Sequence, residues 1–151
     1  MICGALNLAG GPARDLGAFS RLRATAGDGE LAVHGALAVA TTGPEVTTAR
    51  TGDLACVFAG ALYGPDALAH RLGIVAGCDG AGLAAQAYRR HGVDALATLR
   101  GRFAVVIWDA ASGCGLLATD VLATRQLYTR RVADELLFAG EVRDLLPLLA
   151  T

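Results

Sequence analysis

The residue with the most chemical potential is Cys3, which lies in the opening stretch MICGALNLAGG. A cysteine thiolate is a strong nucleophile, so a cysteine near the start of a chain could attack a substrate carbonyl. The same residue could equally be an ordinary member of a short apolar strand that ends at Gly10-Gly11-Pro12. The opening residues leave both interpretations open.

The other reactive residue types form no recognisable site in the sequence. The four cysteines are spread along the chain without a C-x-x-C pair, which disfavours a zinc site built on that spacing. We expect the other three, Cys56, Cys78 and Cys114, to be small apolar residues with free and mostly buried thiols. The three histidines lie far apart, and Ser112 belongs to no nucleophile motif. The sequence therefore predicts no metal site and no cofactor.

Composition favours one well-packed globular domain over residues 1–151, because 54% of the residues are hydrophobic and 18% are charged. All 13 basic residues are arginine, and the net charge is −1 without a basic cluster beyond two arginine pairs. This pattern argues against a nucleic-acid partner. No apolar run approaches the ~20 residues that span a bilayer, and no signal peptide is recognisable. We therefore expect a cytoplasmic protein with no membrane partner.

Apolar periodicity and turn signals predict strands, then helices, then strands again. We expect helices over residues 14–23, 65–72, 81–91, 93–99 and 141–149. We expect strands over residues 2–9, 54–64, 103–109, 116–120, 126–130 and 136–140, with two or three more within 31–50. This order indicates an α+β fold built on antiparallel sheets. Asp109 and Asp120 flank a hairpin, which favours a turn or hydrogen-bonding role over acid catalysis.

Residues 101–146, GRFAVVIWDAASGCGLLATDVLATRQLYTRRVADELLFAGEVRDLL, carry a series of motifs in one register. They resemble the glutaminase-like domain of asparagine synthetases and related class II glutamine amidotransferases. In that family a G-x-F-A-hydrophobic-W-D strand precedes R-D-x-x-G-x-[KR]-P-L-Y and then F-A-S-E-[IV]-K-x-L-L. The matching residues include Phe103, Trp108, Asp120, Tyr128 and Glu141. Upstream, MICGA occupies the place of M-C-G-I, and VFAGALYG that of F-N-G-E-I-Y-N.

The resemblance implies an Ntn-hydrolase-like fold, which is a four-layer αββα sandwich of two antiparallel sheets. The chain stops soon after its F-A-x-E helix, so the resemblance also implies a domain that is either compact or truncated at its C-terminus. In the family, an N-terminal cysteine attacks the side-chain amide of glutamine, and its own α-amino group is the general base. The asparagine and glycine of N-G-E form the oxyanion hole. An arginine and acidic residues hold the glutamine.

Two parts of that catalytic machinery are changed in this sequence. Ile2 separates Met1 from Cys3, and an internal amide nitrogen cannot act as a base because its lone pair is delocalised. Ala59 replaces the oxyanion asparagine and leaves only Gly60. Loss of one such donor typically lowers the rate by about 10²–10³.

The substrate-holding residues are changed as well. Ala61 replaces the acidic residue of the N-G-E motif, whereas Asp79 matches the family's second acidic position. The expected arginine falls in AVATTG, where only Thr41 and Thr42 are available. We interpret residues 59–61 and Asp79 as a vestigial substrate pocket, and Cys3 as a vestigial nucleophile.

These departures favour a catalytically inactive glutaminase-like domain that acts as a partner or scaffold module. Disabled domains of this kind precede the ATP-using synthetase domain of β-lactam synthetases and lasso-peptide macrolactam synthetases. The resemblance therefore implies an ATP-dependent, asparagine-synthetase-like partner in natural-product biosynthesis, and self-association through an apolar face is a further option. Two alternatives stay open. One is an active glutamine amidohydrolase with Cys3 freed by removal of Met1-Ile2, and the other is a small-molecule or peptide binder that uses the vacated pocket.

Overall fold

A computed structural model describes residues 1–13 and 30–149 of the chain. It falls into two compact units, Met1–Val46 with Gln126–Thr151 and Thr47–Arg125, and each unit is described by itself. The single domain expected over residues 1–151 stays a prediction. The helix expected over residues 14–23 lies outside the described residues.

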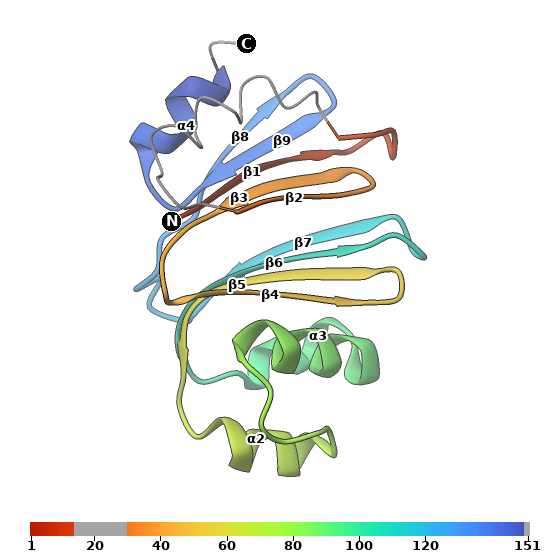
Figure 1. The fold of residues 1–151 in the computed structure, drawn as a ribbon, viewed down its shortest axis with the longest axis vertical. Helices are drawn as coiled ribbons and strands as arrows, with labels where there is room; N and C mark the ends of the chain where they lie inside the picture. Colours follow the sequence, from red (N-terminus) through yellow and green to blue (C-terminus); the bar gives the residue numbers. More distant parts are fainter. Residues whose placement is uncertain (14–29, 150–151) are drawn as a thin grey trace. The chain divides into compact units, whose positions relative to one another are not determined.

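The first unit is built on a five-stranded antiparallel sheet with the order β2-β3-β1-β9-β8. Its strands are β1 (Ile2–Asn7), β2 (Glu30–His34), β3 (Leu37–Thr41), β8 (Tyr128–Val132) and β9 (Glu135–Ala139). Helix α4 (Val142–Leu149) follows β9 and lies on one face of the sheet, against β9 and β8 (Figure 1). β1 is the central strand, because it pairs with β3 on one side and with β9 on the other.

Strand alternation decides which residues of β1 face the helix. Cys3 points to the side of α4 and packs in a cluster of mostly small residues that also contains Leu145 of α4. Gly4 points to the opposite side, where a Cβ atom would lie 2.4 Å from both the Ala38 carbonyl oxygen and the Phe138 ring. The glycine that follows the cysteine is therefore required by the close approach of a neighbouring strand and an aromatic ring.

The second unit is built on a four-stranded sheet with the order β4-β5-β6-β7. Its strands are β4 (Val46–Thr51), β5 (Leu54–Leu62), β6 (Gly101–Asp109) and β7 (Cys114–Thr119). Between β5 and β6 the chain forms α2 (Pro65–Leu72), α3 (Gly80–His91) and the 3₁₀ helix η1 (Val93–Thr98). Helix α3 packs on β5 and β6 (Figure 1), and their core includes the stacked rings of Phe58 and Phe103, with centroids 5.4 Å apart.

The α+β fold with two antiparallel sheets, predicted from the sequence, is confirmed. The segment 31–50 forms strands β2 to β4, with β2 beginning at Glu30. Every other element predicted within the described residues is present; α2 has the predicted bounds, and the bounds of the rest are shifted by one or more residues. The first strand is shorter than predicted because the Asn7 side chain caps a turn, bonding the Ala9 N–H and the Pro12 carbonyl oxygen. The short helix predicted over residues 93–99 is a 3₁₀ helix.

Candidate functional site

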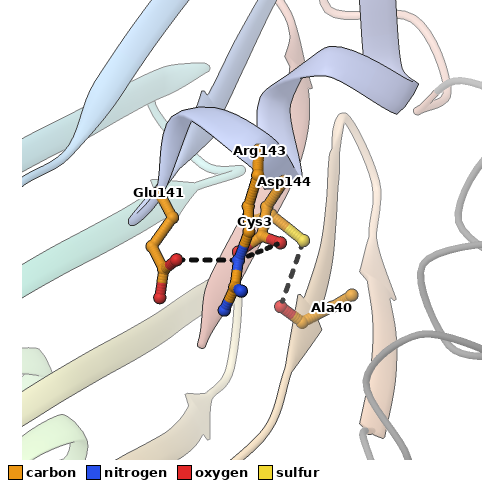
Figure 2. Close-up of polar contacts among 5 residues, drawn as sticks. All are labelled: Cys3, Ala40, Glu141, Arg143 and Asp144. Atoms are coloured by element: carbon orange, nitrogen blue, oxygen red, sulfur yellow. Dashed lines mark hydrogen bonds and ion pairs between the residues drawn. The ribbon is translucent and has the colours of Figure 1, made fainter.

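Cys3 lies at the centre of the first unit's sheet, with its side chain under α4 (Figure 2). The residue is 0% exposed, and its neighbours on that face include the small side chains of Ala38, Ala40 and Ala139. Its Sγ donates a weak hydrogen bond to the Ala40 carbonyl oxygen at 3.9 Å. The thiol is therefore held inside an apolar layer and is not displayed at a surface.

A buried carboxylate, Asp144, lies beside this thiol. Asp144 is on α4, is 6% exposed, and has its carboxylate next to the Cys3 sulfur (Figure 2). The Arg143 Nε is 3.9 Å from Asp144 Oδ1 but only 2.8 Å from the Glu141 carboxylate. Asp144 Oδ2 has no hydrogen-bond partner in the part of the chain that the structure describes. Asp144 was not among the site residues predicted from the sequence, although its spacing from the buried Leu148 on α4 assigns it to the buried side of the helix.

Burial and the nearby negative charge keep the Cys3 thiol protonated. Burial raises the pKa of Cys3 to about 12, the Asp144 carboxylate adds to this rise, and the N-terminal ammonium opposes it. Burial also raises the pKa of Asp144, with Glu141 adding to the rise and Arg143 opposing it. A nucleophilic cysteine needs a lowered pKa or an adjacent base. The surroundings of Cys3 raise its pKa instead.

The two residues before Cys3 are hydrogen-bonded at the edge of the first unit's core: Ile2 begins β1, and Met1 bonds to Thr42, the residue after β3. The Met1 ammonium donates to the Thr42 carbonyl oxygen, and the Thr42 N–H donates to the Met1 carbonyl oxygen at 2.9 Å. The Gly140 N–H donates to the Ile2 carbonyl oxygen at 2.8 Å, and the Ile2 side chain is 3% exposed. The nitrogen of Cys3 is therefore an internal amide of a continuous strand and is no base.

In the second unit, the predicted pocket residues Ala59, Gly60 and Ala61 lie near the end of β5. Gly60 has φ +127°, and a Cβ atom there would lie 2.0 Å from the Arg102 carbonyl oxygen on β6. Ala59 is buried and Ala61 is exposed, and neither offers a polar side chain. Backbone crowding alone therefore explains the glycine that matches the family motif.

Asp79, the remaining predicted pocket residue, caps helix α3. Its backbone is extended, and its Oδ1 accepts a hydrogen bond from the Gly82 N–H at 2.8 Å. An aspartate in this position satisfies an N–H group that has no partner within the helix. This structural task accounts for the match at Asp79. Asp79 and residues 59–61 belong to the second unit and Cys3 to the first, so each is placed within its own unit.

Asp120, a buried residue of the motif series, has a structural role. Its carboxylate accepts hydrogen bonds from the N–H groups of Phe103, Leu122, Thr124 and Arg125 at 3.1–3.4 Å. It also accepts from the Thr124 hydroxyl at 2.7 Å. The hydroxyl and then the N–H groups hold the pKa of Asp120 well below its usual range, against the opposing effect of burial. The hydrogen-bonding role predicted for Asp120 is confirmed.

The expectation of mostly buried thiols is wrong for two cysteines. Cys56 is buried, and burial raises its pKa. Cys78 is partly exposed and accepts a hydrogen bond from Gln86 at 2.9 Å. Cys114 is exposed because β7 begins there, directly after a hairpin turn.

Within residues 1–13 and 30–149, no three His, Cys, Asp or Glu side chains gather into a group that could hold a metal ion. No helix within those ranges is both long enough and apolar enough to cross a membrane.

Comparison with known proteins identifies the family to which the chain belongs. A family model described as a glutamine amidotransferase domain matches residues 31–147. No curated protein matches the chain. The solved structure of glutamine phosphoribosylpyrophosphate amidotransferase from B. subtilis, complexed with ADP and GMP, has a similar fold with a TM-score of 0.65 and 16% sequence identity.

That alignment covers 95% of this chain and 42% of the B. subtilis chain, so this chain spans less than half the length of its structural neighbour. The two antiparallel sheets and their helices match the Ntn-hydrolase-like amidotransferase fold. The family model covers well over half of the sequence. The chain belongs to the glutamine amidotransferase domain family.

Proposed function

We propose that this amidotransferase domain does not hydrolyse glutamine and instead acts as a partner module of an ATP-dependent, asparagine-synthetase-like enzyme that forms amides. The placement of Cys3 is the single observation that carries the proposal. The only cysteine at the position of the family nucleophile is buried under α4, with a raised pKa and a carboxylate beside it. Each of these three features opposes formation of a thiolate that could reach a substrate.

The first alternative, an active enzyme that starts at Cys3, requires removal of two residues that are hydrogen-bonded at the edge of the first unit's core. Burying an isoleucine side chain stabilises a fold by about 1.5–3 kcal/mol, and this contribution would be lost with Ile2. The hydrogen bonds from Thr42 and Gly140 to the removed residues would be lost as well. Even after removal of Met1 and Ile2, Ala59 would supply no side-chain amide to an oxyanion hole.

The partner role is inferred from the reactions that need no ammonia from glutamine. An enzyme that activates a carboxylate with ATP and closes an amide with an amine of its own substrate needs no ammonia from glutamine. Peptide macrolactam and β-lactam formation are reactions of this kind, and the family resemblance points to them. The second alternative, a binder that uses the vacated pocket, predicts that Asp79→Ala weakens ligand binding beyond its effect on the cap of α3.

The proposal is tested by looking for an asparagine-synthetase-like protein among the genes beside that of this chain and co-expressing it with the chain. The expected result is a stable complex whose amide-forming activity does not depend on glutamine and is unchanged by Cys3→Ala. Intact-mass measurement on the same sample reports whether the chain starts at Met1, at Ile2 or at Cys3. A chain that starts at Cys3, together with glutamine-dependent activity that Cys3→Ala abolishes, contradicts the proposal.

A further inference from the structure

The second unit contains a cavity that the proposed function does not use. Its volume is about 360 Å³, and it lies where the turn between β4 and β5, the turn after β6 and the C-terminal end of α3 meet. This volume is at the small end of the range of roughly 300–1,000 Å³ that is typical of ligand pockets. Its polar lining consists of Thr51, Asp53, Tyr88, Arg89 and Asp109.

Two neighbouring side chains of α3 reach the two turns and hold the walls of the cavity in place. Arg89 donates a hydrogen bond from Nη1 to the Thr51 carbonyl oxygen at 3.0 Å, at the end of β4. Tyr88 forms a hydrogen bond with Ser112 in the turn after β6, and the Ser112 hydroxyl donates to the Asp109 carboxylate at 2.8 Å. Because these groups are fixed before a ligand enters, binding requires little further ordering.

The floor of the cavity is formed by residues that face α3 at the end of the sheet. Leu54 of β5 pairs with Asp109 of β6. Cys56 and Ile107, two residues further along these strands, pack in the core with α3, so Leu54 and Asp109 are on the same face. Burial raises the pKa of Tyr88 and the Asp109 carboxylate adds to this rise, which agrees with a position of Asp109 close to α3.

Opposite charges line this cavity without neutralising each other. Within the described part of the chain, no ion pair joins Arg89 to Asp109 or to Asp53. The bond to Thr51 holds the guanidinium at β4, whereas Asp109 is held by the turn after β6. An arginine in the last turn of a helix is favourable by itself because of the helix dipole, but that effect does not explain a carboxylate that lines the same cavity.

We infer that this cavity binds a small zwitterion, a free α-amino acid with an apolar side chain. The ammonium group of the ligand pairs with Asp109 and its carboxylate pairs with Arg89, while Leu54 and the ring of Tyr88 contact its side chain. A ligand that lacks either charge leaves a charged group of the cavity without a partner, which gives specificity. The inference goes beyond the proposed function, because it uses no residue of the Cys3 site or of the vestigial substrate pocket.

Titration of the isotope-labelled full chain, followed by its amide chemical shifts, tests the site. The probe is L-leucine, and its matched controls are isoamylamine, which lacks the carboxylate, and isocaproate, which lacks the amine. We expect leucine to bind at least about tenfold more tightly than either control, because each control leaves one charge of the cavity unpaired. The shifts are expected at Gly92 and Ala111, which line the cavity. The difference between the ligands should shrink at high salt.

Substitutions locate the binding within the cavity. Arg89→Gln is expected to weaken leucine binding about tenfold without weakening isoamylamine, because isoamylamine has no carboxylate. Asp109→Asn keeps an acceptor for its turn and is expected to abolish the preference for leucine over isocaproate. The matched control is Arg90→Gln, since Arg90 is the next residue of α3, is also exposed and lines a different groove. Circular dichroism and thermal unfolding verify that each variant is folded.

Three results overturn the inference. They are no saturable shift at about 20 mM leucine, leucine binding that a folded Arg89→Gln variant leaves unchanged, and a control ligand that binds as tightly as leucine. Equal binding of isoamylamine would assign the cavity to cations in general. Ammonia release from glutamine is measured separately on the same samples. Release of ammonia contradicts the proposed function alone, whereas absence of leucine binding contradicts the amino-acid site alone.

Discussion

The reactivity of the Cys3 thiol gives a quantitative prediction from its surroundings. The perturbation is an aromatic disulfide reagent near neutral pH, and the rate at Cys3 is compared between the native protein and the chain unfolded in urea. Burial raises the pKa of Cys3 from an ordinary value of 9.0 to about 12, which lowers its thiolate fraction about 10³-fold. A thiolate of higher pKa is more nucleophilic, with a Brønsted coefficient of about 0.4–0.5, and this recovers roughly 20–30-fold.

We expect Cys3 to be labelled at least about 30-fold more slowly in the native state than in urea from the change in pKa alone. Because the side chain is 0% exposed, restricted access of the reagent slows the native reaction further. Peptide mass spectrometry assigns the rate to each cysteine, and the exposed Cys114 shows that the reagent is active under native conditions. Asp144→Ala should speed native labelling less than burial slows it, because burial is the largest cause of the raised pKa. Native labelling of Cys3 within about threefold of the unfolded rate would refute this reasoning.

Three further predictions concern stability. Asp144→Ala should raise the free energy of unfolding at neutral pH by about 1–2 kcal/mol, because it removes a buried carboxylate oxygen that lacks a hydrogen bond. Because the pKa of Asp144 is raised in the fold, its contribution to stability is complete below its ordinary pKa and is lost as the pH rises, so urea unfolding should show a smaller gain from the substitution at acidic pH. An equal gain at acidic and neutral pH would contradict the assignment. Asp120→Asn should lower the thermal midpoint of unfolding at neutral pH. Because the fold lowers the pKa of Asp120, the stabilisation by its carboxylate is present above its ordinary pKa and is lost as the pH falls through its native pKa, so the thermal midpoints of the two proteins should converge in acid. A difference in midpoint that stays constant with pH would indicate an effect of packing alone. Ala123→Gly should stabilise the chain by about 0.5–1 kcal/mol, because Ala123 has φ +49° at the glycine position of the family motif. The control is Ala111→Gly, at an exposed alanine whose φ is not positive. Equal effects of the two substitutions in chemical unfolding would contradict the backbone strain at Ala123.

Much of the fold was predictable from the sequence because turn and cap residues punctuate it. Gly92 ends α3, and Pro65 begins α2. The motif series over residues 101–146 predicted both hairpins and the closing helix for the same reason. The first unit was harder to predict, since Glu30–His34 and Leu37–Thr41 are short strands in an alanine- and valine-rich segment whose apolar pattern sets no clear boundary.

The candidate site was only partly predictable. The sequence predicted that Cys3 occupies the family nucleophile position but did not predict the face to which it points, because ICGALN is apolar or small at nearly every position and shows no alternation. The burial of Asp144 depends on how α4 lies against the sheet, which is tertiary information. The cap at Asp79 was within reach of sequence reasoning, since an aspartate before a helical run is an N-cap signal.

Ammonia release from glutamine by the purified chain tests the central claim most directly. The enzyme-coupled rate is measured beside a Cys3→Ala control, with the intact mass of both samples determined. The account predicts that the two rates are equal and that neither exceeds the rate without protein. Glutamine-dependent ammonia release that the Cys3→Ala substitution abolishes would contradict it.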